Sequence, residues 1–251
     1  MITKVDNNHI TQNPKAGRPL GHQNQEGSDY DRLFYPYLFE GGTANSEEVL
    51  AEVRQSTLEK CHKVVALRQA ILDSSIDQIV EAGSAMERAF TAGGTLFAFG
   101  NGGSTTDAQD LVADLTSPPF EGYRPLPAIA LTNDMAVITA VANDVGFENI
   151  FARQIIAFGR PGDIAFGIST SGSSTNVLAA LRQAKKQEML TVALVGYSGG
   201  KMGEDASVDF CLLTPGEHIP RIQEAQATVY HALLEVVWTL IIEARVRVAF
   251  S

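Results

Sequence analysis

The 251-residue sequence contains only two cysteines, Cys61 and Cys211, and neither belongs to a CxxC or CxxH pattern. This scarcity excludes a disulfide framework and a zinc site made mainly of cysteines. Both cysteines lie in apolar stretches with regular spacing, so we expect two buried free thiols.

The sequence also has no long uninterrupted apolar run. Residues 1–12 are polar and lack the apolar core of a secretory signal. The most apolar stretch, residues 229–242, contains His231 and Glu235 and is too short to cross a bilayer. We therefore expect a cytoplasmic protein without a membrane partner.

Positive charge is scarce, because 19 Lys and Arg residues stand against 29 Asp and Glu residues, which gives a net charge of −10. This balance argues against direct binding of nucleic acid through a broad basic surface. It leaves a phosphate site open, because a single site needs local hydrogen-bond donors rather than a positive net charge. The apolar content of 45% is ordinary for a globular protein with a sizeable core.

Residues 1–44 show neither helical nor strand periodicity. We expect a partly disordered extension, whose aromatic segment 33–39 docks on its own domain or on a neighbouring subunit. The folded domain is predicted at residues 45–251. It is expected to begin with a helical arm made of two helices, at about 46–73 and 76–91, the second ending at a pair of glycines.

After residue 94, short apolar runs alternate with amphipathic segments. The runs predict strands buried on both faces, at 95–99, 128–131, 163–168, 191–194 and 209–213. The segments predict helices at 104–115, 134–142, 149–158, 174–187 and 220–247. This alternation indicates an α/β fold with a mostly parallel sheet, in which ligands bind beyond the carboxyl ends of the strands.

A glycine loop, Gly100-Asn-Gly-Gly-Ser104, follows the first expected strand and opens a helix. Glycines let backbone N–H groups approach an anion, and the helix N-terminus adds partial positive charge. Position 105 is threonine and no Gly-Lys-Ser/Thr follows, so the loop is neither a good dinucleotide fingerprint nor a Walker loop. Taken alone, it is either a tight turn or a ligand loop.

A hydroxyl loop, Ser169-Thr-Ser-Gly-Ser-Ser174, lies between a buried strand and the next helix. Ser173 or Ser174 is the natural N-cap of that helix. Capping does not explain the three hydroxyl residues before the glycine. Hydroxyl and helix N–H groups together form a neutral cradle for a phosphate monoester, so this loop favours a phosphate site over a solvated turn.

The helix after the glycine loop carries Asp107, Asp110 and Asp114. Asp110 and Asp114 are four residues apart and share a face, where like charges repel by a few tenths of a kcal/mol. This spacing is compatible with a solvated acidic face, or with a functional pair that a cation or a substrate stabilises.

In this order, the glycine loop, Asn143-Asp144, the hydroxyl loop and Arg221-Ile-Gln-Glu224 resemble the sugar isomerase (SIS) domain. The closer resemblance is to the phosphoheptose (sedoheptulose 7-phosphate) isomerase group, over about residues 46–245. It implies a three-layer αβα sandwich with a five-stranded sheet, and a homotetramer with sites between subunits. It also implies that sugar phosphate contacts Asn101, Gly102, Gly103, Ser104, Asn143, Asp144, Ser169, Thr170, Ser171, Ser174 and Gln223.

The resemblance implies catalytic roles as well, with Asp114 as the base and His231 as the acid of an aldose–ketose isomerase. It further implies a divalent metal, zinc in the resembling enzymes, and no nucleotide cofactor. The metal ligands would be Asp110, Asp114, Gln223 and His231. A hydrogen-bonded core histidine is the alternative for His231, because its neighbours in the sequence are apolar.

Two of these four positions depart from the family, which has histidine at position 110 and glutamate at position 114. Aspartate is shorter than glutamate by one methylene, and a base misplaced by roughly 1 Å can cost about 10²-fold in rate. Loss of the imidazole shifts the ligands towards oxygen donors, which suit harder cations than zinc. Gln223 and His231 are also about 12 Å apart along a helix, so one ion meets both only through extended side chains or different subunits.

Two functions therefore stay open. One is an isomerase that interconverts aldose and ketose forms of a sugar phosphate such as sedoheptulose 7-phosphate. The other is a non-catalytic, sugar-phosphate-binding or regulatory protein that acts through a protein partner, as a replication-initiator-associating relative of this fold does. The altered aspartates favour the second function. The retained loops, Gln223 and His231 favour the first, which is the one we expect.

Overall fold

A computed structural model of the chain describes residues 46–249. The extension at 1–44 lies outside the described residues, so the docking of segment 33–39 stays a prediction. The chain divides into two compact units, Met1–Ala51 and Glu52–Ser251. Of the first unit, the structure describes only residues 46–51, which form the beginning of helix α2 (Ser46–Thr91).

Helix α2 is one continuous helix, so the predicted break near residues 74–75 is wrong. The serines there fit inside the helix, because Ser74 Oγ donates to the Ala70 carbonyl at 2.7 Å and Ser75 is buried. The predicted glycine stop is confirmed. Gly93 has a φ of +93°, a left-handed conformation that commonly ends helices.

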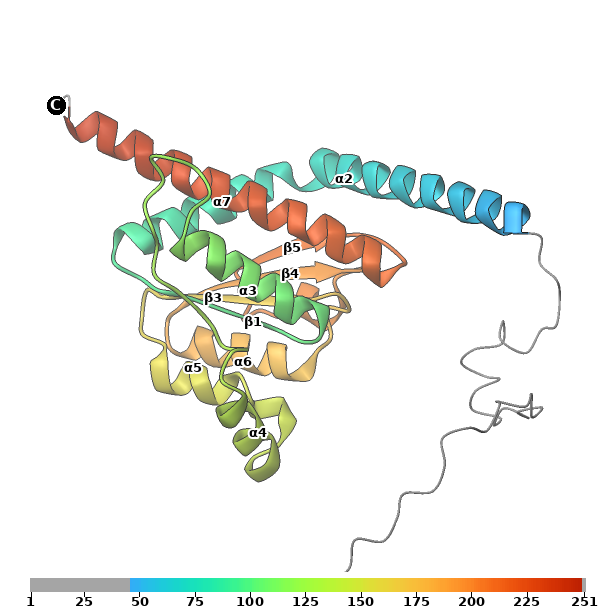
Figure 1. Cartoon of the computed structure of the whole chain (residues 1–251). Coiled ribbons are helices and arrows are strands. Elements are labelled where there is room, and N and C mark those ends of the chain that lie inside the picture. The colour runs from blue at the N-terminus through green and yellow to red at the C-terminus, as the bar shows by residue number, and fades with distance from the viewer. Residues whose placement is uncertain (1–45, 250–251) are drawn as a thin grey trace, which may run out of the picture. The chain divides into compact units, whose positions relative to one another are not determined.

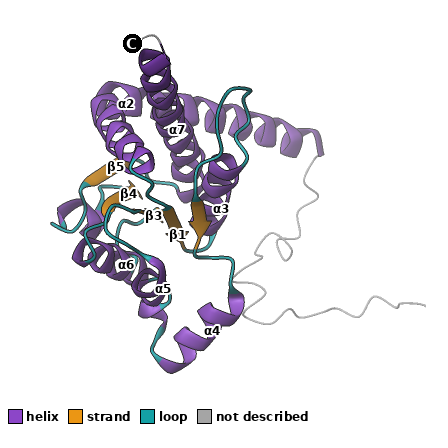
Figure 2. Cartoon of the chain, turned by 90° about the vertical axis from the view of Figure 1, so that its left-hand side faces the viewer, coloured by secondary structure: helices purple, strands orange, loops and turns teal. Residues whose placement is uncertain are grey.

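The second unit contains a five-stranded sheet with the order β2-β1-β3-β4-β5, in which all neighbouring strands are parallel. Every strand overlaps its predicted range. The strands are β1 (Leu96–Gly100), β2 (Ala128–Ala130), β3 (Ile164–Ser169), β4 (Leu190–Gly196) and β5 (Phe210–Thr214). Helices cover both faces of the sheet, which confirms the three-layer αβα sandwich (Figures 1 and 2).

The helices after β1 are α3 (Gly103–Thr116), α4 (Met135–Asp144), α5 (Ala152–Phe158), α6 (Thr175–Lys186) and α7 (Ile219–Ala249). Two short 3-10 helices, η2 (Phe147–Asn149) and η3 (Gly200–Glu204), complete the set, and η2 takes up the start of the helix predicted at 149–158. On one face of the sheet, α3, α7 and the later part of α2 form a core, while α5 and α6 form a second core on the other face.

The position of β1 beside β3 places the two loops of interest next to each other. Its neighbours are β2 on one side and β3 on the other, so the strand order reverses beside β1. Gly100 at the end of β1 is aligned with Ile168 near the end of β3. The glycine loop and the hydroxyl loop therefore leave the same edge of the sheet side by side, where ligands of such sheets bind.

The two cysteines differ from the prediction of two buried thiols. Cys61 is exposed, because it lies on a stretch of α2 whose side chains between residues 52 and 63 are almost all exposed. Cys211 is half-buried on the edge strand β5, where burial raises the pKa of its thiol.

Helix α7 is longer than the apolar stretch seen in the sequence. Over Ile219–Val246 it is long and apolar enough to cross a membrane, by length and composition alone. Half of its most apolar window is buried inside the protein, where Leu233 and Val237 belong to the core. The apolar character of α7 is therefore accounted for by its packing on the sheet.

Close approach of α2 and α7 depends on Gly83, because a Cβ atom at this position would lie 2.6 Å from Val236 Cγ1. We expect Gly83→Leu to lower the free energy of unfolding by about 1–3 kcal/mol through overpacking, as measured by urea denaturation. Gly203→Ala is the control, because the space around Gly203 is open, and we expect a change within about 0.5 kcal/mol. Unchanged stability of Gly83→Leu would contradict this contact.

Candidate functional site

A pair of asparagines joins the glycine loop to the helix that follows the hydroxyl loop. The Asn101 and Asn176 side chains exchange two hydrogen bonds, each amide nitrogen donating to the other Oδ1 at 2.8 Å. Asn176 is buried and lies in the first turn of α6. These two hydrogen bonds therefore hold the glycine loop beside the helix that follows the hydroxyl loop.

Three hydroxyl groups gather at the end of β3. Ser169 Oγ lies 2.9 Å from Ser174 Oγ and 3.4 Å from Ser171 Oγ. Ser174 occupies the N-cap position of α6 but makes no side-chain capping bond, and Ser173 Oγ instead accepts from Lys201 N–H. Ser174 is therefore the N-cap residue, as predicted, but its hydroxyl pairs with Ser169 instead of accepting from a backbone N–H group of α6. The resulting cluster at a helix N-terminus has the chemistry that a phosphate group requires.

The segment after β4, residues 196–202, packs against the hydroxyl loop. Gly172 has a φ of +61°, and a Cβ atom there would lie 2.0 Å from the Gly199 carbonyl oxygen. Met202 N–H donates to the Gly172 carbonyl at 2.9 Å. The glycine between the hydroxyl residues is required by this contact, so segment 196–202 has a structural role.

Gln223 is the residue of α7 that reaches the glycine loop. A Cβ atom at Gly103 would lie 1.8 Å from Gln223 Nε2, so a larger residue at this position would displace the end of the Gln223 side chain. Beside the same loop, a cavity of about 220 Å³ is lined in part by Gly102 and Thr132. Thr132 Oγ1 is buried and has no hydrogen-bond partner among the described residues. The glycine loop thus lines a hollow at the carboxyl edge of the sheet.

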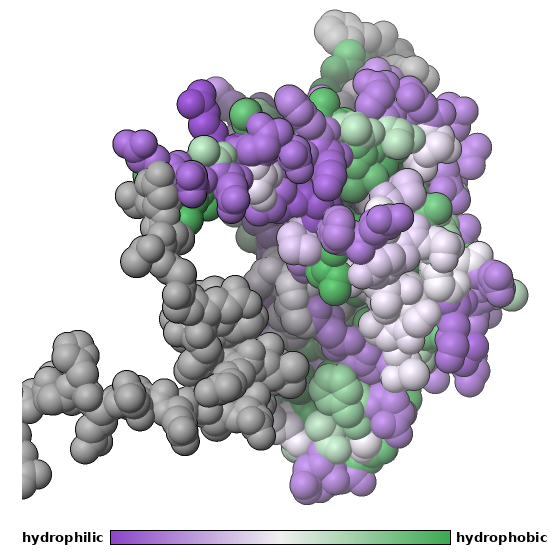
Figure 3. Space-filling model, turned by 90° about the vertical axis from the view of Figure 1, so that its right-hand side faces the viewer, coloured by the Kyte–Doolittle hydropathy of each residue, from purple (hydrophilic) through white to green (hydrophobic). Residues whose placement is uncertain are grey.

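Figure 3 looks onto this carboxyl edge of the sheet. Between hydrophilic and hydrophobic areas it shows a broad pale surface of intermediate hydropathy, the character of glycine, serine and threonine. Asn143 and Asp144 stand apart from it, exposed at the end of α4. Asn143 Nδ2 donates to Asp144 Oδ1 at 2.8 Å, and the structure records no hydrogen bond from either residue to the loops within residues 46–249.

A second group of polar side chains lies between α3 and α7. His231 Nε2 lies 3.3 Å from Asp114 Oδ2 and 3.7 Å from Asp110 Oδ2. The side chain of His231 is 51% exposed, so it is not the core histidine that its apolar neighbours suggested. Asp110 and Asp114 therefore do more than form a solvated acidic face, because both carboxylates approach Nε2 of His231.

Tyr230 belongs to this group, although the sequence reasoning missed it. Its hydroxyl donates to Asp110 Oδ2 at 2.6 Å, while its ring is buried. Burial, followed by the hydrogen bond to Asp110, raises the pKa of Tyr230, so the phenol keeps its proton and remains a donor. The only sign in the sequence that Tyr230 belongs to the site was its position next to His231. The spacing of residues within α7 does not show which of its side chains contact α3.

Burial also perturbs the carboxyl groups of α3. It is the largest cause that raises the pKa of Asp107, to about 6, and the charge of Asp110 adds to the effect. Asp107 Oδ2 is buried without a hydrogen-bond partner in the described part of the chain. Burial and then the charge of Asp110 raise the pKa of Asp114, while His231 opposes both. Perturbed carboxyl groups of this kind are common at catalytic sites.

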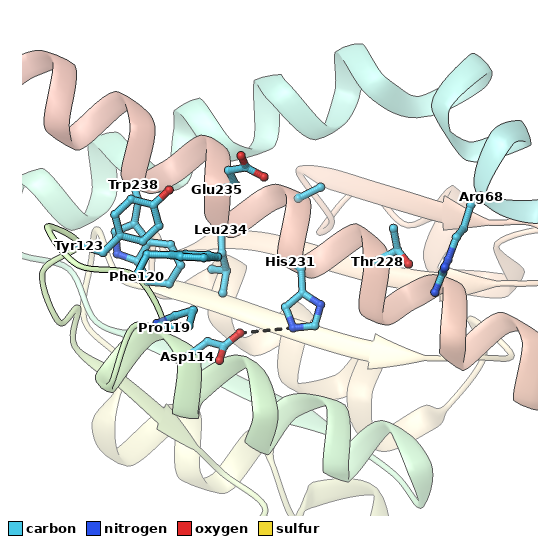
Figure 4. A pocket seen from close by; sticks show the side chains of 11 residues that line it. Arg68, Asp114, Pro119, Phe120, Tyr123, Thr228, His231, Leu234, Glu235 and Trp238 are labelled. Carbon is cyan, nitrogen blue, oxygen red and sulfur yellow. Dashed lines mark ion pairs between the residues drawn. The ribbon is translucent and has the colours of Figure 1, made fainter. Parts of the chain in front are cut away.

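Asp114 and His231 face a cavity of about 620 Å³ (Figure 4). Tyr123 stacks on Trp238 at one end, with ring centroids 4.8 Å apart, and Arg68 of α2 lies at the other end. Concave, mainly apolar cavities with a few polar groups are typical of small-molecule sites. Along α3, Asp114 is ten residues from Ser104, so about 15 Å separates this cavity from the glycine loop.

Three of the four predicted metal ligands lie together, because Asp110 Oδ2 and Asp114 Oδ2 both approach His231 Nε2, whereas Gln223 lies against the glycine loop. Gln223 packs against Gly103, Asp110 accepts a hydrogen bond from Tyr230, and Asp114 pairs with His231. Among residues 46–249, no group of three or more His, Cys, Asp and Glu side chains could hold a metal ion. The zinc site stays a prediction from the resemblance.

Comparisons with known proteins agree with the fold. Residues 61–196 match the model of the SIS domain. The phosphoheptose isomerase of Roseiflexus sp. (strain RS-1) is 41% identical over 180 residues, which cover 72% of this chain and 90% of that protein. The phosphoheptose isomerase of Aquifex aeolicus (strain VF5) is 40% identical over 190 residues, 74% of this chain and 98% of the relative.

Solved structures give the same result. Phosphoheptose isomerase GmhA from Neisseria gonorrhoeae superposes with a TM-score of 0.69 at 33% identity, covering 74% of this chain and 98% of that one. A phosphoheptose isomerase from Francisella tularensis has a TM-score of 0.66, also at 33% identity, over 78% of this chain and 99% of its own.

The negative charge of Asp110 can be tested by its effect on Asp114. We expect Asp110→Asn to lower the pKa of Asp114, because the charge of Asp110 is one of the causes that raise it, whereas the asparagine oxygen still accepts from Tyr230. A carbon-13 NMR titration of the Asp114 carboxyl group measures this pKa. Asp77→Asn on the exposed face of α2 serves as the control. Equal pKa values of Asp114 in the parent and in Asp110→Asn would refute the electrostatic contact.

Proposed function

Because the chain belongs to the SIS domain family and, within it, to the phosphoheptose isomerases, we propose that it interconverts the ketose and aldose forms of a seven-carbon sugar phosphate. The observation that carries the proposal is the Asp114–His231 pair, at 3.3 Å, facing a cavity. The relatives favour an isomerase over the non-catalytic, partner-dependent alternative.

The reaction moves a proton between two adjacent carbons. In our proposal, the Asp114 carboxylate removes a proton from the carbon next to the carbonyl, and His231 gives a proton to the carbonyl oxygen. The resulting enediol returns to a carbonyl compound when Asp114 delivers its proton to the neighbouring carbon and His231 takes one from the other hydroxyl group. Burial favours this role, since an aspartate with a raised pKa is a stronger base than an ordinary one.

The phosphate group is assigned to the hydroxyl cluster and the glycine loop, where helix N-termini and hydroxyl groups supply donors. About 15 Å along α3 separates Ser104 from Asp114. An extended sugar phosphate that reaches both must use most of its length, so the separation favours a seven-carbon substrate over shorter ones. Sedoheptulose 7-phosphate is the substrate we would test first.

A homo-oligomer, with four chains by analogy with the family, would explain two features of the surface. From Val53 to Val80, the described part of α2 exposes six large apolar side chains, at positions 53, 58, 65, 72, 76 and 80. Burying them against another copy would remove apolar surface from water. Exposed Asn143 and Asp144 would then be available to the sugar-phosphate site of another copy. A cytoplasmic location stays a prediction.

The oligomer can be tested on α2. We expect Leu58→Glu combined with Val65→Glu to reduce the particle mass measured by light scattering, because two carboxylates would have to be buried in the interface. Gln78→Glu introduces a single carboxylate at an exposed polar position of α2 and is expected to keep the parental mass. A parent protein that is monomeric would overturn the proposed assembly.

Substitution of Asp114 should impair catalysis, whereas substitution of Ser171 should impair binding of the sugar phosphate. With sedoheptulose 7-phosphate as substrate and aldose formation as the signal, we expect Asp114→Asn to lower kcat by about 10²–10⁴-fold, because the base is lost. Ligand-induced thermal stabilisation should survive in this variant. Ser171→Ala should lose much of that stabilisation instead, because a hydroxyl of the phosphate cluster is missing. Asp77→Asn is the common control.

Two results would change the assignment. A parent protein that binds the sugar phosphate, by thermal shift, but never forms the aldose would support the non-catalytic alternative. The assay is also run with a chelator and with added zinc, because the proposed proton transfers use only side chains of this chain. A rate that depends on zinc would restore the predicted metal site and contradict this scheme.

A further inference from the structure

Tyr230 lies at the centre of the polar group between α3 and α7. It is 2% exposed, and the charges of Asp110, Asp107 and Asp114 all act on its hydroxyl. Its hydrogen bond to Asp110 joins residues 120 positions apart in the sequence. The proton transfers proposed above do not use this bond, so its role is unexplained by them.

One oxygen atom of Asp110 makes both contacts. Asp110 Oδ2 accepts from Tyr230 at 2.6 Å and lies 3.7 Å from His231 Nε2. The side chain of Asp110 is 55% exposed, so little packing holds it in place. An exposed aspartate samples several rotamers, and a hydrogen bond from a buried phenol selects one of them. That rotamer is the one that brings the carboxylate to the imidazole.

We propose that Tyr230 is a positioning residue of this isomerase, which holds the Asp110 carboxylate beside His231 and thereby fixes the imidazole between Asp110 and Asp114. The proposal rests on the isomerase function given above. The Asp110 carboxylate lies 3.7 Å from the same Nε2 that faces Asp114, so its charge attracts a protonated imidazole and favours this orientation of the ring. The Tyr230 ring also lies against the His231 ring, with centroids 4.5 Å apart, a contact that phenylalanine would keep. The Tyr230 hydroxyl acts through Asp110, and Tyr230 is not among the residues that line the cavity.

This arrangement also accounts for the aspartate at position 110. Aspartate is short, and from α3 alone it would be free to turn towards solvent. The phenol ring spans the space between the two helices, with its body in the core and its hydroxyl at the carboxylate. The pair Tyr230–Asp110 therefore works as one unit, contributed by two helices.

The test is a kinetic double-mutant cycle. We expect Tyr230→Phe to lower kcat about tenfold while KM stays within about twofold, because the substrate contacts remain and only the acid–base geometry is disturbed. In an Asp110→Ala background, Tyr230→Phe should cost nothing more, since the bond is already gone. A merely structural tyrosine would lower kcat by the same factor in both backgrounds, and that result would overturn the proposal.

Controls separate this inference from loss of the fold and from failure of the isomerase assignment. Asp77→Asn changes an exposed side chain of α2 away from both loops and should leave kcat unchanged. The NMR signals of the His231 ring report its surroundings without turnover, and we expect them to shift in Tyr230→Phe but not in Asp77→Asn. Unshifted signals would refute the proposal even if the parent has no activity. Should Tyr230→Phe not fold, the same shift is expected in Asp110→Ala.

Discussion

The hydrogen bond from Tyr230 of α7 to Asp110 of α3 is the interaction on which the rest of the site depends. Both helices begin at the carboxyl edge of the sheet and run away from it side by side. Gln223 lies against Gly103 in their first turns, and seven residues further along each helix Asp110 meets Tyr230. The same packing of α7 on α3 places His231 beside Asp114.

The fold was predictable because its signals are local. Buried strands such as 163–168 are continuous apolar runs, and the turn residues around them mark their ends. The neighbourhood of the two loops was predictable too, because alternation of strands and helices brings the carboxyl ends of parallel strands to one edge. The resemblance added the catalytic positions, which residue spacing alone left open between a solvated face and a functional pair.

What escaped prediction depends on contacts between distant segments. Nothing near Tyr230 in the sequence shows that its hydroxyl crosses to another helix. Ser174 has the position of a cap, yet Ser169 from the preceding strand offers its hydroxyl a different partner. Cys61 follows the apolar period of α2, but periodicity does not show whether the face it marks is covered within one chain. Each of these features is decided by contacts with segments that a local sequence pattern does not include.

Because α3 and α7 pack in one register, the contacts of Asp110 and Asp114 with α7 depend on the number of residues that precede them in α3. One residue inserted between Gly103 and Asp110 would turn every later side chain of α3 by about 100°. Asp110 and Asp114 would then leave α7, although their chemical identity and the helix itself were intact. An inserted residue would disturb the site less in a connection such as the one between α3 and β2, where no such register has to be kept.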